Sequence, residues 1–215
     1  SDLLALTQAY LKKISQLNPM LNAVISINPK ALEQASDIDK RRQMGEKLHP
    51  IAGIPVLIKD NIDITELPTT AGSLALADSY TERDAAIITN LRARGAILLG
   101  KTNLSEWANF RSEHSTSGWS AVGGQTRNPH DFDRSPCGSS SGSAVAIAAR
   151  LAPLAIGTET NGSIICPASV NGVVGFKPSI GQLPQMGIVP IALTQDTAGP
   201  LATSVASANL LFQAM

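Results

Sequence analysis

Four serines stand close together in the middle of the chain, beside two glycines and just before a run of small apolar residues. They are Ser139, Ser140, Ser141 and Ser143. Serine is a favoured cap at the start of a helix, but one cap needs only one serine. A helix start also gathers free backbone N–H groups and a partial positive charge, which favour a developing anion. The cluster therefore indicates serine chemistry as well as the start of a helix.

A second polar stretch, GTETNGSIICP at 157–167, separates two apolar runs. Its Asn161–Gly162 pair suits positive φ, so the chain can turn sharply and present successive N–H groups on one side. Such a turn is typical of an oxyanion hole, which stabilises the charged intermediate of acyl transfer. A plain tight turn after a strand would explain Asn161 and Gly162, but it gives no purpose to the polar residues before them.

A reactive serine needs a base, and no Ser-His-Asp arrangement can be built from the three histidines, His49, His114 and His130,. The apolar run PVLI instead leads directly to Lys59. Burial would disfavour the Lys59 ammonium, lower its pKa and leave a neutral amine able to accept a proton. Taken alone, Lys59 is more simply a lysine that extends its amine to solvent from a strand end.

The elements that must position these residues alternate between helix and strand, which is typical of an α/β fold. Helices are expected from the chain start to Asn18–Pro19 and at 31–44, 84–95, 103–110, 142–151 and 203–215, and strands at 55–58, 96–100 and 153–157,. Residues 111–141 are rich in Ser, Gly, Asn and Pro and too long for a simple connector, so a functional loop region is expected there. Neither the first nor the last helix shows an end signal, so we expect a chain cut at both ends.

Composition argues against several classes of partner. The 215 residues are 43% hydrophobic, and 17 Lys and Arg balance 17 Asp and Glu, so neither nucleic acid nor an anionic membrane is indicated,. The apolar runs are shorter than the roughly 18 residues that span a bilayer, and no leader opens the chain, so a soluble cytoplasmic protein is expected. A GxxxxGK[ST] match at 95–102 is rejected as a phosphate-binding loop, because its AILL centre is expected to be a strand.

The two cysteines, Cys137 and Cys166, form no CxxC pair and have no histidine at ligand spacing. Neither a disulfide framework nor a zinc site is therefore indicated, and no metal or organic cofactor is expected. We expect both thiols to be reduced, as is usual in the cytoplasm. They lie two residues before Ser139 and three after Ser163, so they are near neighbours if the two serine stretches meet.

Five separated blocks resemble, in order, the successive motifs of the amidase signature family. They are IAGIPVLIKDNI, GAILLGKTNLSEWA, RNPHDFDRSPCGSSSGSAVAIAA, AIGTETNGSIICPAS and GVVGFKPSIGQLPQMGIVPI. The resemblance covers nearly the whole chain. It implies the family's α/β/α fold, a mixed sheet flanked by helices, with residues 1–215 forming the N-terminal portion and carrying the whole signature.

The resemblance also implies a Ser-Ser-Lys triad. Ser163 matches the nucleophile, Lys59 the base, and Ser139 the serine that bridges them and follows an unusual cis peptide bond. The family's interval of 24 residues between the two serines is kept. The family's oxyanion hole falls on the backbone N–H groups of Thr160, Asn161, Gly162 and Ser163.

The implied activity is hydrolysis of a carboxamide to a carboxylate and ammonia through an acyl-enzyme. The wording SEWANF, SGWS and SPCGSSSGS is most similar to the peptide amidase branch, whose members act on C-terminal peptide amides. Phe110 and Ser112 are candidates for the lining of the substrate pocket. Ile165 stands where many members have arginine, which separates the chain from the glutaminase component of the tRNA-dependent amidotransferase.

Two alternatives stay open. The chain could be a glutaminase of the amidotransferase type, which feeds ammonia to a charged tRNA, or a non-catalytic fragment that binds or assembles. Family members are about twice this length, so the C-terminal half of the family is absent from residues 1–215. We therefore expect that the missing half, or self-association, covers part of this segment.

Overall fold

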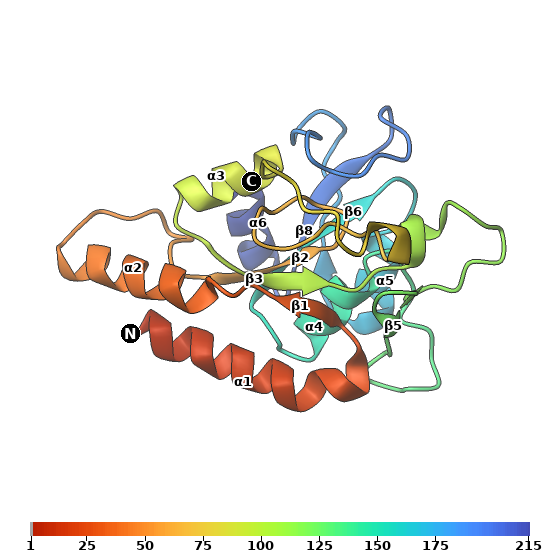
Figure 1. The fold of residues 1–215 in the computed structure, drawn as a ribbon, viewed down its shortest axis with the longest axis horizontal. Helices are drawn as coiled ribbons and strands as arrows, with labels where there is room; N and C mark the ends of the chain where they lie inside the picture. The colour runs from red at the N-terminus through yellow and green to blue at the C-terminus, as the bar shows by residue number, and fades with distance from the viewer. Residues whose placement is uncertain (1) are drawn as a thin grey trace.

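A six-stranded mixed sheet forms the centre of the computed structural model, which describes residues 2–215 (Figure 1). The strands lie in the order β1-β3-β2-β6-β8-β7. Their bounds are β1 Val24–Ile27, β2 Pro55–Lys59, β3 Ile97–Thr102, β6 Leu154–Glu159, β7 Val174–Gly175 and β8 Thr197–Ala202. Strand β2 runs parallel to β3 and β6, whereas β1, β8 and β7 are antiparallel to their neighbours. A separate hairpin joins β4 Trp119–Ser120 to β5 Gly124–Gln125.

Helices cover both faces of this sheet. Their bounds are α1 Leu3–Leu21, α2 Ala31–Gln43, α3 Ala86–Ala93, α4 Ser141–Ala148, α5 Ile165–Asn171 and α6 Val205–Ala214, with short 3-10 turns η1 Leu74–Leu76 and η2 Glu106–Asn109. One apolar cluster joins α3 and α6 to one face, and a second joins α1, α2, α4 and α5 to the other. Figure 1 shows α3 and α6 on one side of the sheet and α1 and α2 side by side on the other. The predicted α/β/α fold with a mixed sheet is thus confirmed.

Strands β2, β3, β6 and β8 are buried along their whole length. A strand covered by helices on both faces needs apolar side chains at successive positions rather than at alternate ones. The runs PVLI, AILLG and PLAIG have this pattern, and the strands predicted from them are confirmed. Because AILL lies in β3, its backbone is paired with other strands and does not form a phosphate-binding loop.

The first helix differs from its prediction at both ends. Asp2 caps the start of α1 by accepting a backbone N–H of the first turn, so the helix is not cut at its beginning. It also continues through Pro19 to Leu21. A proline this close to a helix end removes only one hydrogen bond. Asn18 then ends the helix, because its side-chain oxygen accepts two N–H groups from beyond the last turn.

The helix predicted at 103–110 is wrong. Asn103 is fully buried, and its side chain is hydrogen-bonded to the β4–β5 hairpin through Gly124 and Ser120. Only η2 is helical in this stretch, and within it Trp107 and Ala108 have positive φ. Tertiary hydrogen bonds therefore override the helical propensity of NLSEWANF. Within the described residues, no helix has both the length and the apolar character needed to cross a membrane.

A buried ion pair joins the exits of β2 and β3. Lys101 Nζ lies 2.9 Å from Asp60 Oδ1, and both side chains are almost completely excluded from water. The ammonium also donates to the carbonyl of Pro68 and the hydroxyl of Thr69, while Thr70 donates to Asp60. Burial lowers the pKa of Lys101, and the charge of Asp60 opposes that shift. Each of these two buried charges depends on the other.

We predict that Asp60→Asn lowers the free energy of unfolding by about 3–5 kcal/mol, because it leaves the Lys101 ammonium buried without a counter-charge. The double variant Asp60→Asn/Lys101→Met should recover part of this loss. Lys40→Gln, which breaks the exposed Lys40–Asp37 pair, is the control and should change little,. Urea unfolding of the four proteins measures the effect. An Asp60→Asn variant as stable as Lys40→Gln would show that the pair is not structurally important.

Candidate active site

Two parallel strands bring the candidate base to one edge of the sheet. Lys59 is the last residue of β2, and Thr158 and Glu159 end β6. The two strands are paired with Ile58 opposite Ile156, so Lys59 leaves the sheet beside the end of β6. The carboxyl ends of neighbouring parallel strands are where sites form in α/β proteins.

The amine of Lys59 is completely buried among oxygen atoms that carry no formal charge. Its Nζ lies 2.7 Å from Ser139 Oγ, 2.7 Å from Thr158 Oγ1 and 3.3 Å from the Thr158 carbonyl oxygen. Burial lowers the pKa of Lys59 to about 7, although the charges of Glu159 and Asp196 act in the opposite direction. A neutral amine has two N–H groups and one lone pair. Donating both N–H groups to Thr158 leaves the lone pair to accept the Ser139 hydroxyl proton.

The serine cluster uses its hydroxyls individually rather than as a helix cap. Helix α4 has no side-chain cap bond at Ser140, whose Oγ donates to the Thr158 carbonyl and accepts the Thr158 N–H. Ser141 donates to the carbonyl of Cys137, and Ser143 to that of Ile156. Of the four, only Ser139 contacts Lys59, and the Gly138–Ser139 peptide bond is cis. The extra serines fasten the start of α4 to β6 and to the preceding loop.

The Ser163 loop leaves the end of β6 with the predicted sharp turn. Gly162 has a φ of 83°, and nothing lies within 4 Å of the place where a Cβ would stand. The buried carboxylate of Glu159 accepts the N–H groups of Ile164 and Ile165, which holds the start of α5 under the loop. The N–H of Ser140 donates to the Ser163 carbonyl oxygen at 3.1 Å. The two serine stretches therefore meet through the backbone.

Four consecutive N–H groups in this loop donate no hydrogen bond within residues 2–215. They belong to Thr160, Asn161, Gly162 and Ser163. The Ser163 hydroxyl is half-buried and likewise has no hydrogen-bond partner among the described residues. The Thr160 hydroxyl donates to Asp196, whose other oxygen accepts the N–H groups of Ile191 and Ala192. This carboxylate ties the loop to the segment before β8.

The cysteines correct one sequence-based expectation. Cys137 and Cys166 form a disulfide, with Cα atoms 6.0 Å apart, rather than two free thiols. The loop before Ser139 and the start of α5 after Ser163 are brought to bonding distance by the fold, which the spacing of the residues could not show. Disulfides persist mainly in oxidising compartments, so this bond weighs against the predicted cytoplasmic location, which stays a prediction.

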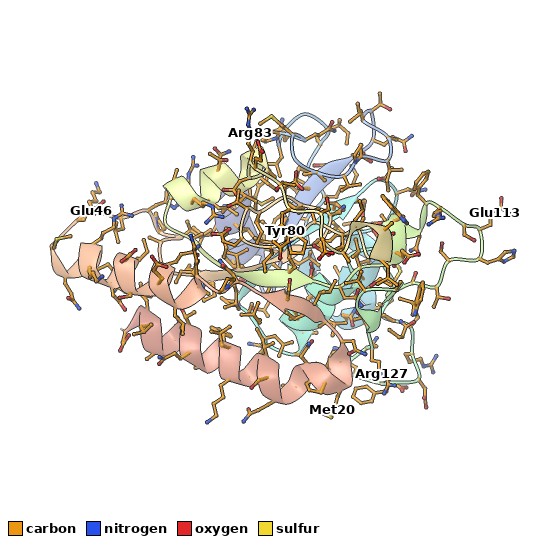
Figure 2. The ribbon with its side chains drawn as sticks, in the orientation of Figure 1. Met20, Glu46, Tyr80, Arg83, Glu113 and Arg127 are labelled. Carbon is orange, nitrogen blue, oxygen red and sulfur yellow. A yellow bond between two sulfur atoms is a disulfide. The ribbon has the colours of Figure 1, made fainter. Side chains whose placement is uncertain are left out.

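The two pocket candidates have different positions. Phe110 lies at the edge of a hollow that is also lined by Asn61 and Trp107. Ser112 lies in an exposed turn and lines a different hollow with Glu106 and Trp119. Figure 2 places Glu113, the residue next to it, at the tip of a loop that projects away from the sheet. Ser112 is therefore not brought to the Lys59 site.

The site also includes residues for which the sequence suggested no role. Thr158, Glu159 and Asp196 hold the amine of Lys59, the start of α5 and the Ser163 loop, respectively. The only signal in the sequence was their polarity at the end of an apolar run. Across residues 2–215, no group of three His, Cys, Asp or Glu side chains is placed to hold a metal ion.

Comparison with known proteins identifies the family. The Amidase family model matches residues 5–215, so the chain belongs to the amidase family. The structure of native peptide amidase from Stenotrophomonas maltophilia has a TM-score of 0.98 and 56% sequence identity, and it covers 100% of this chain and 45% of that one.

Two sequence relatives carry different names. A protein of Arabidopsis thaliana named "Probable amidase" is 49% identical over 98% of this chain and 42% of its own length. The A-type component of the glutamyl-tRNA(Gln) amidotransferase of Thermobifida fusca is 46% identical over 97% of this chain and 41% of its own. The chain thus spans less than half the length of these relatives.

The buried amine makes a prediction about stability. An unfolded lysine stays protonated up to a pH of about 10.4, whereas folded Lys59 loses its proton near pH 7,. The unfolded chain therefore binds the extra proton between these values, and the contribution of Lys59 to stability rises with pH across this window. We expect Lys59→Met to be more stable than the wild type at pH 7, by on the order of 3 kcal/mol after the lost hydrogen bonds.

This advantage of Lys59→Met should shrink as the pH rises toward 10, which urea unfolding at several pH values would measure. Other titrating groups are common to both proteins and cancel in the difference. A difference that does not change with pH would mean that Lys59 is buried in its charged form.

The disulfide makes a second prediction. Replacing both cysteines, Cys137→Ser/Cys166→Ser, should lower the free energy of unfolding by roughly 3–4 kcal/mol, the loop-closure contribution for a loop of this length. A reductant should weaken the wild type similarly and leave the double variant unchanged. Alkylation of the unfolded, unreduced protein followed by mass spectrometry is the direct check, because two modified thiols would contradict the bond.

Proposed function

We propose that this chain carries the catalytic residues of an amide hydrolase, which converts a carboxamide and water to a carboxylate and ammonia. The observation that carries the proposal is the fully buried Lys59 amine, 2.7 Å from Ser139 Oγ and without a carboxylate partner. Such an amine is neutral near physiological pH and can accept a proton from a hydroxyl. Four unpaired N–H groups lie on the neighbouring loop.

In the proposed mechanism, Ser163 Oγ attacks the carboxamide carbon. Its proton passes to Ser139, which in turn gives its own proton to Lys59 Nζ. The carbonyl oxygen becomes an oxyanion, which the N–H groups of residues 160–163 stabilise. Collapse of this intermediate breaks the C–N bond, and the nitrogen takes the proton back from Lys59 through Ser139 and leaves as ammonia. Water then attacks the acyl-enzyme through the same relay and releases the carboxylate.

We propose C-terminal peptide amides as the substrate class. The support is the 56% identity to a protein named peptide amidase, together with the apolar hollow beside the site. We propose further that whole-protein activity requires additional chain, or a second copy, over this segment. The relatives extend well beyond the matched portion, and large apolar side chains near the site, such as Phe110 and Leu193, are exposed.

A glutaminase that supplies ammonia to a charged tRNA is the second candidate. The 46% identity to the A-type component of a glutamyl-tRNA(Gln) amidotransferase favours it. Ile165 in place of arginine after the nucleophile and the balanced charge of the chain argue against it. Hydrolysis of glutamine and of a peptide amide, compared in one assay, would separate the two candidates.

Labelling with a serine-reactive fluorophosphonate, together with turnover of a peptide amide, tests the mechanism. Ser163→Ala and Lys59→Ala should each lose nearly all activity, and Ser139→Ala should keep a measurable residue because water can replace its hydroxyl. The double variant Lys59→Ala/Ser163→Ala should be little worse than either single variant, since the three residues act as one unit. Wild-type kcat/KM should rise with pH through a limb near pH 7, as Lys59 loses its proton,.

Ser141→Ala is the matched control, because its hydroxyl binds only the carbonyl of Cys137. It should keep most of the labelling and turnover. Residues 1–215 are labelled alone and with any natural flanking sequence, which tests whether this segment is a non-catalytic fragment. Wild-type turnover by a folded Lys59→Ala variant with an unchanged pH profile would refute the proposed base.

A further inference from the structure

Asn61 has a buried oxygen without a partner, two residues after Lys59. Its side chain is 4% exposed, and its Nδ2 donates to Thr158 Oγ1 at 2.9 Å. The Asn61 backbone carbonyl accepts the N–H of Val189, which fixes the position of the residue. Its Oδ1, however, accepts no hydrogen bond from the described residues. Buried amide oxygens are nearly always hydrogen-bonded, so this one is suited to accept from a bound molecule.

Trp107 supplies the complementary group, a buried indole Nε1–H that has no acceptor among the described residues. Its segment is fixed next to the candidate triad, because the N–H of Ser105 donates to the carbonyl of Ser139 at 3.1 Å. Gly138 permits this approach, since a Cβ there would lie 2.2 Å from Ser105 Oγ. The backbone N–H of Trp107 is held by the carbonyl of Ala71. The indole position is therefore set by the site itself.

Both unpaired atoms belong to residues that line one small apolar hollow of about 240 Å³, together with Phe110, Val189, Pro190 and Ile191. Asn61 and the same three residues of segment 189–191 also line the adjacent hollow, which holds Thr158, Glu159 and Thr160. The two hollows thus meet at Asn61, beside the oxyanion loop. Asn109 and Asn171 also have a buried side-chain oxygen without a partner, but neither lines these hollows.

We propose that Asn61 Oδ1 and Trp107 Nε1 bind the peptide group next to the scissile carboxamide. The substrate's peptide N–H donates to Asn61, and its peptide C=O accepts from Trp107. The scissile carboxamide does not take this place, because its oxygen belongs on the N–H groups of residues 160–163. The inference rests on the proposed function and narrows its substrate class to N-acylated amino acid amides and peptide amides, as opposed to simple alkyl amides.

Two amides test this selection, N-acetyl-L-leucinamide and 4-methylpentanamide, which lacks the acylamino group but has the same side chain. The enzyme is assayed with any natural flanking sequence retained. Trp107→Phe keeps an aromatic ring and removes the donor, and Asn61→Leu removes the acceptor. Each should lower kcat/KM for the acylated amide roughly 10- to 100-fold and for the simple amide less than about threefold, because only the first loses a hydrogen bond.

Trp119→Phe is the matched control, because the other tryptophan lines a different hollow, and it should affect neither substrate. The pH limb of kcat/KM should stay in place in Trp107→Phe, which separates recognition from a change at Lys59. Equal losses on both amides, or no loss on either, would overturn the proposal.

Binding to the Ser163→Ala protein makes this test independent of turnover. Ligand-observed NMR should show tighter binding of N-acetyl-L-leucinamide than of 4-methylpentanamide, and adding Trp107→Phe should remove that preference. If the wild type hydrolyses neither amide but this preference is present, the proposed function fails and the recognition site stands. Equal binding of the two amides would overturn the site, even if both are hydrolysed.

Discussion

The burial of the Lys59 amine without a carboxylate is the constraint on which the rest of the site depends. Lys101 lies on the neighbouring strand at the same end of the sheet and is equally buried, but Asp60 supplies its counter-charge. Lys59 is surrounded by hydroxyl and carbonyl oxygens. The same low-dielectric surroundings therefore favour an ion pair at one lysine and a neutral base at the other.

The geometry around that amine comes from three connections of the backbone. Parallel pairing of β2 with β6 brings Lys59 to Thr158. The start of α4 is fastened to β6 by serine hydroxyls, and that places Ser139 on the amine. A disulfide and a backbone hydrogen bond join the Ser139 loop to the Ser163 loop. A reacting group on a loop needs such support, because small displacements are costly in catalysis.

Recognition and chemistry share atoms in this arrangement. The Thr158 hydroxyl accepts from both Lys59 Nζ and Asn61 Nδ2, and Asn61 lines the hollows beside the oxyanion loop. A side chain that orients a substrate therefore also touches the residue that orients the base. The neighbouring apolar segment at 189–191 is tied back to the loop through Asp196 and Thr160. The walls of the pocket and the catalytic loop are parts of one hydrogen-bonded unit.

The sequence by itself determined the features that depend on neighbouring residues. Continuous apolar runs predicted the buried strands, Asn161–Gly162 predicted the sharp turn, and the order of motifs predicted the family and the α/β/α fold. Roles for Ser139, Ser163 and Lys59 followed from that resemblance. These inferences succeeded because strand burial, turn conformation and motif order are written in short stretches of chain.

Only the tertiary structure decided what depends on distant segments meeting. It ended α1 beyond Pro19, replaced the helix at 103–110 with a short turn and paired Cys137 with Cys166. It also distinguished the two buried lysines, since a lysine's charge state is set by atoms from other strands and not by its neighbours in sequence,.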